Sequence, residues 1–125
     1  MFVSAFTNAY TAELVMFEQA GCIWCETFDR EIAPIYPKTA EGKRAPLRRV
    51  NIDSPLPPDL NFIEIERLAP LFVLVESGQE IGRIRGYPGD EHFWGLLQVL
   101  VKKLDSAGTG GERTWLHEKS LRAAG

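Results

Sequence analysis

The two cysteines of the chain, Cys22 and Cys25, are three positions apart, and their spacing indicates redox chemistry. An apolar run of strand length, residues 13–17, precedes them, and apolar residues with helical spacing follow them. A Cys-x-x-Cys pair between a strand and a helix is typical of a thiol–disulfide site. The first turn of a helix has unpaired N–H groups and the positive end of the dipole, so a thiolate at Cys22 should be stabilised. Cys25, one turn further on, is then placed to resolve what Cys22 attacks.

Three less reactive interpretations of the cysteine pair stay open. A structural disulfide would close a very short loop, which gains little from closure. Half of a zinc site would need two more ligands, and the remaining candidates, His92 and His117, are far apart in the sequence. Two inert buried cysteines are less compatible with the exposed corner that Gly21 and a helix start predict. We therefore favour redox chemistry.

Length and composition predict one globular domain. The 125 residues are enough to bury a core, and 45% hydrophobic and 25% charged residues are ordinary for such a domain. A net charge of −3 gives no reason to expect nucleic acid or an anionic membrane as a partner. No apolar run approaches the roughly 18 residues of a membrane span. The first six residues do not form a complete signal peptide, which fits either a cytoplasmic protein or one whose upstream signal was removed.

The apolar patterns predict the element order β-α-β-α-β-β-α. Strands are expected at residues 12–18, 47–53, 71–75 and 80–85, and helices at 22–36, 59–68 and 90–104. We expect Pro34 to kink the first helix, residues 38–46 to form a polar connection, and Gly82 to mark a bulge. The first strands, joined by a helix, should be parallel, and the turn at Ser77 and Gly78 should make an antiparallel hairpin.

The two ends of the chain have weaker patterns. Phe2, Phe6 and Tyr10 recur at helical spacing, so a short leading helix is expected. Residues 106–111 have the composition of a flexible linker, and 112–125 form a polar tail. We therefore expect a domain over residues 1–105, followed by a linker and tail over 106–125.

Over residues 12–104 the chain resembles the thioredoxin fold, a mixed four- to five-stranded sheet flanked by helices. A narrower resemblance is to the SoxS-type thioredoxins of bacterial sulfur oxidation. It rests on Phe17-Glu18-Gln19-Ala20-Gly21-Cys22-Ile23-Trp24-Cys25, Glu31-Ile32-Ala33-Pro34-Ile35-Tyr36-Pro37-Lys38-Thr39, Pro46-Leu47-Arg48-Arg49-Val50, and Gly86-Tyr87-Pro88-Gly89 before Phe93-Trp94. Those proteins are periplasmic thiol–disulfide reductases, thought to keep cysteines of sulfur-oxidation proteins reduced.

The resemblance implies specific roles. Cys22 matches the attacking cysteine, Cys25 the resolving one, Pro70 a proline held in cis facing the disulfide, and Gly86 a glycine of the substrate groove. Ile23, Trp24 and Ala69 complete the expected substrate-binding set. The resemblance implies no metal and no cofactor beyond the redox-active disulfide. Expected partners are protein disulfides and an upstream thiol donor, with no nucleic acid or membrane insertion, for a periplasmic monomer.

The chain departs from ordinary thioredoxins at three points. Ile23-Trp24 matches neither the Gly-Pro of ordinary thioredoxins nor the Pro-His of strong oxidases. Ala69 precedes Pro70 where Thr, Ile or Val is common, and Met16 stands where thioredoxins bury a proton-handling aspartate. Glu18 is the nearest acid on the same strand face.

The direction of the chemistry is expected to be reduction. Neither residue between the cysteines is cationic and Glu26 is acidic, so the Cys22 pKa should fall only moderately and the potential should lie near the reducing value of about −270 mV. The alternatives are an oxidase or isomerase, a Cys-x-x-Cys module for a soft metal such as Cu(I), and a non-catalytic binding domain.

Overall fold

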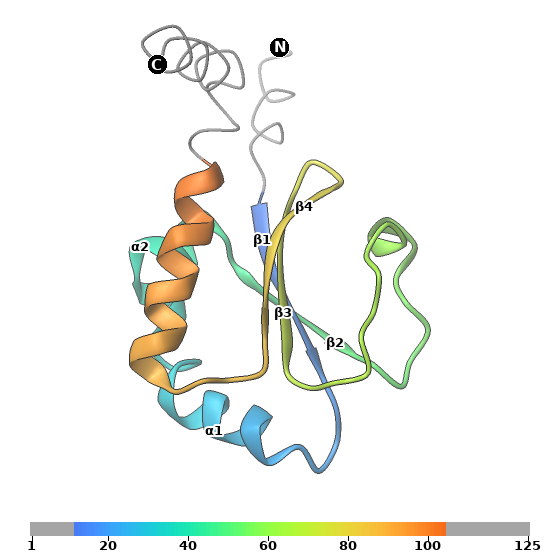
Figure 1. Ribbon diagram of the computed structural model, residues 1–125, viewed down its shortest axis with the longest axis horizontal. Helices are drawn as coiled ribbons and strands as arrows, with labels where there is room; N and C mark the ends of the chain where they lie inside the picture. The colour runs from blue at the N-terminus through green and yellow to red at the C-terminus, as the bar shows by residue number, and fades with distance from the viewer. Residues whose placement is uncertain (1–11, 105–125) are drawn as a thin grey trace, which may run out of the picture.

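The computed structural model describes residues 12–104 (Figure 1). Its elements are β1 (Ala12–Glu18), α1 (Ile23–Glu31), the 3₁₀ turn η2 (Tyr36–Lys38), α2 (Ala40–Arg44), β2 (Leu47–Asn51), the 3₁₀ turn η3 (Pro58–Leu60), β3 (Leu71–Glu76), β4 (Gln79–Arg85) and a helix over residues 90–104. The leading helix expected around Phe2, Phe6 and Tyr10 and the linker and tail expected over 106–125 lie outside the described residues.

The strands form one mixed sheet in the order β2-β1-β3-β4. β1 and β2 are parallel, with Met16 opposite Arg49, and β1 and β3 are antiparallel, with Phe17 opposite Leu71. β3 and β4 form the expected hairpin. The end of β1, the start of β3 and the end of β4 therefore meet at one end of the sheet, where the chain also enters α1 (Figure 1).

The two faces of the sheet are covered in different ways. Helices cover one face, where Met16 of β1, Phe28 of α1 and Phe93 of the 90–104 helix belong to one buried cluster. The segment between β2 and β3 covers the other face, where Leu60 and Ile63 pack with Val15 and other strand residues. Figure 1 shows the 90–104 helix and α2 on one side and this segment on the other. The cysteine pair belongs to the helical face.

The helix that follows the cysteines is shorter than expected. α1 ends at Glu31, and the backbone N–H groups of Ile32 and Ala33 both donate to the carbonyl of Phe28, at 2.8 and 3.1 Å. Pro34 has no N–H with which to continue the ladder. It therefore follows the end of the helix and does not kink a helix that runs to residue 36.

The segment expected as a polar connection contains a short helix, α2. Its first turn is capped by the Thr39 hydroxyl, which accepts a hydrogen bond from the Gly42 N–H at 2.9 Å. Gly42 is buried against the carbonyl of Tyr36, where a Cβ atom would clash. Five residues are too few to show a helical period, so the cap and this close contact define the helix.

The helix expected over residues 59–68 is wrong. Only the 3₁₀ turn η3 forms there, and the chain then runs irregularly to β3. Ile63 is buried but Ile65 is exposed, so the apolar residues do not share one helical face. β2 also ends at Asn51, two residues before its expected end.

The expected bulge is present in β4, next to Gly82. Leu74 pairs with Gly82 while Val75 pairs with Glu80, which leaves Ile81 as the extra residue. Gly82 itself lies under Leu100 of the 90–104 helix, where a Cβ atom would clash with the leucine side chain. The glycine therefore lets the helix approach the sheet closely.

Candidate redox site

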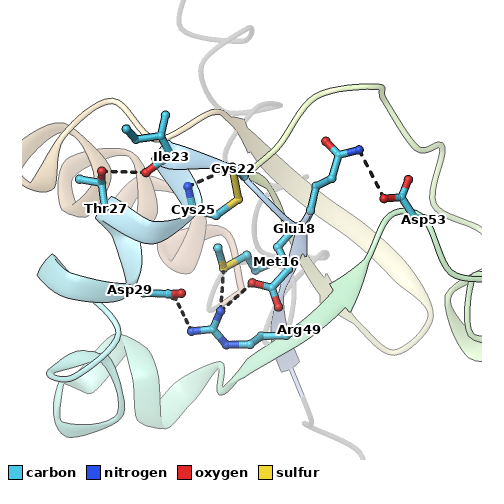
Figure 2. Close-up of a disulfide and its surroundings, with 10 residues drawn as sticks. Met16, Glu18, Cys22, Ile23, Cys25, Thr27, Asp29, Arg49 and Asp53 are labelled. Carbon is cyan, nitrogen blue, oxygen red and sulfur yellow. Dashed lines mark hydrogen bonds and ion pairs between the residues drawn. A yellow bond between two sulfur atoms is a disulfide. The ribbon is translucent and has the colours of Figure 1, made fainter.

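The cysteines lie where the chain turns from β1 into α1. Gly21 has a φ of +75°, a value that favours glycine, and Cys22 follows as the N-cap of α1. The Cys22 Sγ accepts a hydrogen bond from the backbone N–H of Cys25 at 3.0 Å. The two sulfur atoms form a disulfide, with Cα atoms 5.2 Å apart (Figure 2). The first sulfur thus occupies the place where a helix end best stabilises negative charge.

The two sulfurs differ in environment. Cys22 is partly exposed, whereas Cys25 is only 4% exposed and belongs to the buried cluster on the helical face. The outer sulfur is thus the one that an external disulfide meets first. The inner sulfur is surrounded by apolar side chains, which oppose its ionisation.

The residues between the cysteines are the most exposed large apolar side chains at the end of the sheet that carries the disulfide. Ile23 is 65% exposed and Trp24 is 56% exposed. They follow Cys22 directly, and their apolar surface is in contact with water. Tryptophan is one of the residue types that most often anchor protein contacts.

The peptide bond between Ala69 and Pro70 is cis, as the sequence predicted. The Pro70 carbonyl accepts a hydrogen bond from the Gly86 N–H at 2.8 Å, which places both residues where β3 begins and β4 ends. Gly86 has a φ of +82°. Cys22 and Ala69 both pack against the same buried cluster, so these residues lie at the same end of the sheet as the disulfide. That Pro70 faces the cysteines stays a prediction.

An aromatic cluster supports α1 beneath Cys25. The ring of Phe28 lies 4.9 Å from that of Phe72, 5.3 Å from Phe93 and 5.8 Å from Tyr87, measured between centroids. The Tyr87 hydroxyl donates a hydrogen bond to Glu31 Oε1 at 2.6 Å. Burial, followed by this carboxylate, raises the pKa of Tyr87 well above its ordinary value. Tyr87 thus ties the end of α1 to the loop that carries Gly86.

An arginine at the rim of the same cluster was not expected from the sequence. Arg49 of β2 donates to Glu18 Oε1 at 2.8 Å and to Asp29 Oδ1 at 2.7 Å, and its Nη1 also lies 3.8 Å from the sulfur of Met16 (Figure 2). Met16 is fully buried, and no carboxylate occupies its place. Glu18 is thus paired with a cation. The signal in the sequence was a charged residue on the strand face that also carries Leu47.

Comparison with solved structures identifies the family. The periplasmic thioredoxin SoxS from Paracoccus pantotrophus, in its reduced form, is 44% identical; the match covers 73% of this chain and 96% of that chain, with a TM-score of 0.69. The chain belongs to the thioredoxin family. A thioredoxin from Thermus thermophilus (20% identity, 87% of this chain and 88% of that chain, TM-score 0.60) and one from Fasciola hepatica (18%, 73% and 82%, TM-score 0.55) have the same fold. No family model and no curated protein matches the chain.

Membership in the family points to thiol–disulfide oxidoreductase activity on protein disulfides. Thioredoxins generally use the cysteine pair itself and need no cofactor. Within residues 12–104, no group of three or more potential metal ligands is found, and no helix is long and apolar enough to cross a membrane.

Proposed function

We propose that this thioredoxin is a protein-disulfide reductase in which Cys22 attacks and Cys25 resolves. The observation that supports this most directly is the asymmetry of the pair. Cys22 is partly exposed at the α1 N-cap and accepts the Cys25 N–H, whereas Cys25 is buried. An N-cap thiolate is stabilised by the helix end, and an exposed thiolate is reached by a protein substrate.

The reaction consists of two exchanges. The Cys22 thiolate attacks one sulfur of the partner disulfide, forms a mixed disulfide with it and releases the other sulfur as a thiolate. Cys25 then loses its proton to solvent and attacks the Cys22 Sγ. The Cys22–Cys25 bond forms, the bond to the partner breaks, and the partner leaves as a second thiolate. The partner gains two electrons, and an upstream thiol donor must reduce the disulfide again.

The proposed substrate groove combines three parts of the end of the sheet that carries the disulfide. Ile23 and Trp24 present exposed apolar surface beside Cys22. Ala69, ahead of the cis Pro70, would offer its backbone to an extended peptide of the partner, and Gly86 would leave space for it. The hydrogen bond from the Gly86 N–H to the Pro70 carbonyl supports a fixed spacing between these last two parts.

The proposed direction is reduction of the partner. Strong oxidants in this family depend on additional stabilisation of the attacking thiolate. Here Ile23 and Trp24 are neutral, and the nearest following charge, Glu26, is negative and exposed. Stabilisation by the end of α1 then acts nearly alone, which favours a potential near the reducing value of about −270 mV.

The partner and compartment are proposed by similarity. SoxS of Paracoccus pantotrophus is a periplasmic thioredoxin, which supports a periplasmic location for this protein as well. We propose that it acts as a monomer and keeps cysteines of partner proteins reduced, in the manner suggested for SoxS-type thioredoxins.

Turnover of a protein disulfide tests the proposal. The full chain should accelerate reduction of insulin by dithiothreitol, and the Cys22→Ser variant should not. Equilibration with glutathione should give a potential near about −270 mV, and a value above roughly −180 mV, the range of isomerases, would reverse the direction.

Two further measurements identify the partner and test the metal alternative. The Cys25→Ser variant should accumulate a mixed disulfide, from which the partner is identified by mass. Titration of the reduced protein with Cu(I) tests the soft-metal alternative, since tight binding without turnover would favour a metal module.

A further inference from the structure

Two adjacent arginines of β2, Arg48 and Arg49, each form two ion pairs, one arginine on each face of the sheet. We call each arginine with its two carboxylates a clamp. Arg49 points to the helical face and bridges Glu18 of β1 to Asp29 of α1, with hydrogen bonds of 2.8 and 2.7 Å. Arg48 points to the other face and bridges Glu13 of β1 to Asp59 of η3, with hydrogen bonds of 3.1 and 2.7 Å. Each arginine thus joins one strand residue to one residue outside the sheet. Only the Arg49 clamp holds the helix that carries the cysteines.

The Arg49 clamp adjoins the buried cluster of Cys25. The Arg49 guanidinium reaches the sulfur of Met16, which belongs to that cluster, and Asp29 lies one helical turn after Cys25 on α1 (Figure 2). Burial lowers the pKa of Arg49, but Asp29 and Glu18 outweigh this effect, so the net pKa shift is upward and the side chain stays a cation.

The resolving step needs a charge where the protein disfavours one. Cys25 must become a thiolate before it attacks Cys22, yet it is 4% exposed among apolar side chains, which raises a thiol pKa. At the cysteine end of the surrounding elements, the charged and titratable groups are Glu18 (β1), Arg49 (β2), Arg85 (β4, paired with Glu66), Glu26, Asp29, Arg30 and Glu31 (α1), Tyr87 (the loop after β4), and the exposed Asp90, Glu91 and His92 (the 90–104 helix). Of these, Tyr87 is neutral and hydrogen bonded to Glu31, and Arg49 is a cation whose guanidinium lies 3.8 Å from the sulfur of Met16, a member of the cluster.

We propose that Arg49 is a positioning residue for the resolving step: it neutralises Glu18 and Asp29 beside the cysteine helix and so keeps buried Cys25 able to ionise. The inference rests on the proposed function, since it concerns the second exchange of that reaction. The sign of the effect follows from simple electrostatics. Without Arg49 the two carboxylates are uncompensated, and nearby negative charge raises the pKa of a thiol.

The thiol pKa of Cys25 is measurable directly, because the chain has two cysteines and the Cys22→Ser variant leaves one. In that background, the rate of alkylation against pH gives the Cys25 pKa. Arg49→Met should raise it by about one unit, a shift typical of one nearby charge, which lowers the thiolate fraction at neutral pH about tenfold. Arg49→Lys, which keeps the charge, should restore most of the difference.

Arg48→Met is the matched control. It removes the same number of ion pairs from the neighbouring residue of the same strand, on the opposite face. It should lower stability to a similar extent and leave the Cys25 pKa unchanged. In the protein with both cysteines, Arg49→Met should slow release of the reduced partner about tenfold at neutral pH, and this defect should shrink as the pH rises.

Equal Cys25 pKa values in the Arg49→Met and Arg48→Met variants would overturn the inference. If Arg49→Met does not fold, Glu18→Gln and Asp29→Asn provide the same test with the opposite sign, since each should lower the Cys25 pKa, and no change in either would also overturn it. The proposed function fails separately, by absence of turnover in the unmodified protein, because the single-thiol titration needs no turnover.

Discussion

Replacement of Tyr87 by phenylalanine removes one hydrogen bond at the end of the sheet that carries the disulfide. The hydroxyl donates to Glu31 at 2.6 Å, and it ties the end of α1 to the loop that begins at Gly86. The ring of Tyr87 also contacts Phe28 edge-on and is retained in the variant. Tyr87→Phe therefore tests the hydrogen bond and leaves the packing in place.

The expected loss is about 1 kcal/mol in the free energy of unfolding. A hydrogen bond to a charged group is worth roughly 1.5–3 kcal/mol, but Glu31 is exposed, so water replaces the lost donor and the cost lies below that range. For a domain of this size, such a loss lowers the melting temperature by roughly 4–8 °C. The same variant should reduce protein disulfides more slowly, because the position of Gly86 is less fixed.

The pH dependence of stability provides a second test of Tyr87. Its pKa is raised above the ordinary value of about 10 by burial, followed by the Glu31 carboxylate. The unfolded chain therefore loses this proton first as the pH rises. The contribution of the protonated Tyr87 to the free energy of unfolding is fully present below about pH 10. It falls above that pH, by up to about 1.4 kcal/mol per pH unit. Tyr87→Phe should make this alkaline decline shallower.

Urea unfolding of the oxidised protein, together with insulin reduction, measures both effects. Tyr36→Phe is the control, because the Tyr36 hydroxyl donates to the buried carbonyl of Ala45 at 2.6 Å and has no link to Gly86. It should lower stability by at least as much and leave turnover unchanged. Stability and an alkaline decline in Tyr87→Phe equal to those of the unmodified protein would refute the reasoning.

Three further experiments test other parts of the structure. In the reduced protein, Cys22 should be alkylated before Cys25 at neutral pH, and the reverse order would exchange their roles. Gly82→Ala should cost about 1 kcal/mol in unfolding by urea, because its methyl group displaces Leu100, and Leu100→Ala in the same chain should recover part of that loss; purely additive costs would contradict the contact. Trp24→Ala should lose more kcat/KM on insulin than on a small disulfide, and equal losses would remove Trp24 from the docking surface.

Much of the fold was predictable because its central elements have strong periods. β1, the β3–β4 hairpin and the 90–104 helix agree with the expected bounds to within one residue. α2 was not predictable, because its five residues are defined by a threonine cap and by contact with a residue outside the helix. The helix expected over 59–68 failed because Ile63 and Ile65 alternate between core and solvent.

The cysteine pair was predictable for a different reason: its chemistry is confined to a few consecutive residues. The cis Pro70 was expected from the resemblance to the thioredoxin fold, because an X-Pro pair by itself does not specify a cis bond. The Arg49 clamp was not, since its partners lie 31 and 20 residues away, on β1 and α1. A run of two arginines in a strand predicts one charge on each face, but it does not say which acids meet them.

The unequal cover of the two sheet faces has a consequence for how the molecule fluctuates. Over residues 54–63, the backbone hydrogen bonds of the segment between β2 and β3 are single local turns, such as those from the N–H groups of Leu60 and Ile63. Such a segment opens at a lower free energy than a packed helix. Its amides should therefore exchange with deuterium before those of α1, and the apolar face beneath it would become wet while the cysteine helix stays docked. Substitutions within residues 54–63 are separated from the disulfide by the sheet, so this part of the segment can vary in sequence without altering the redox chemistry.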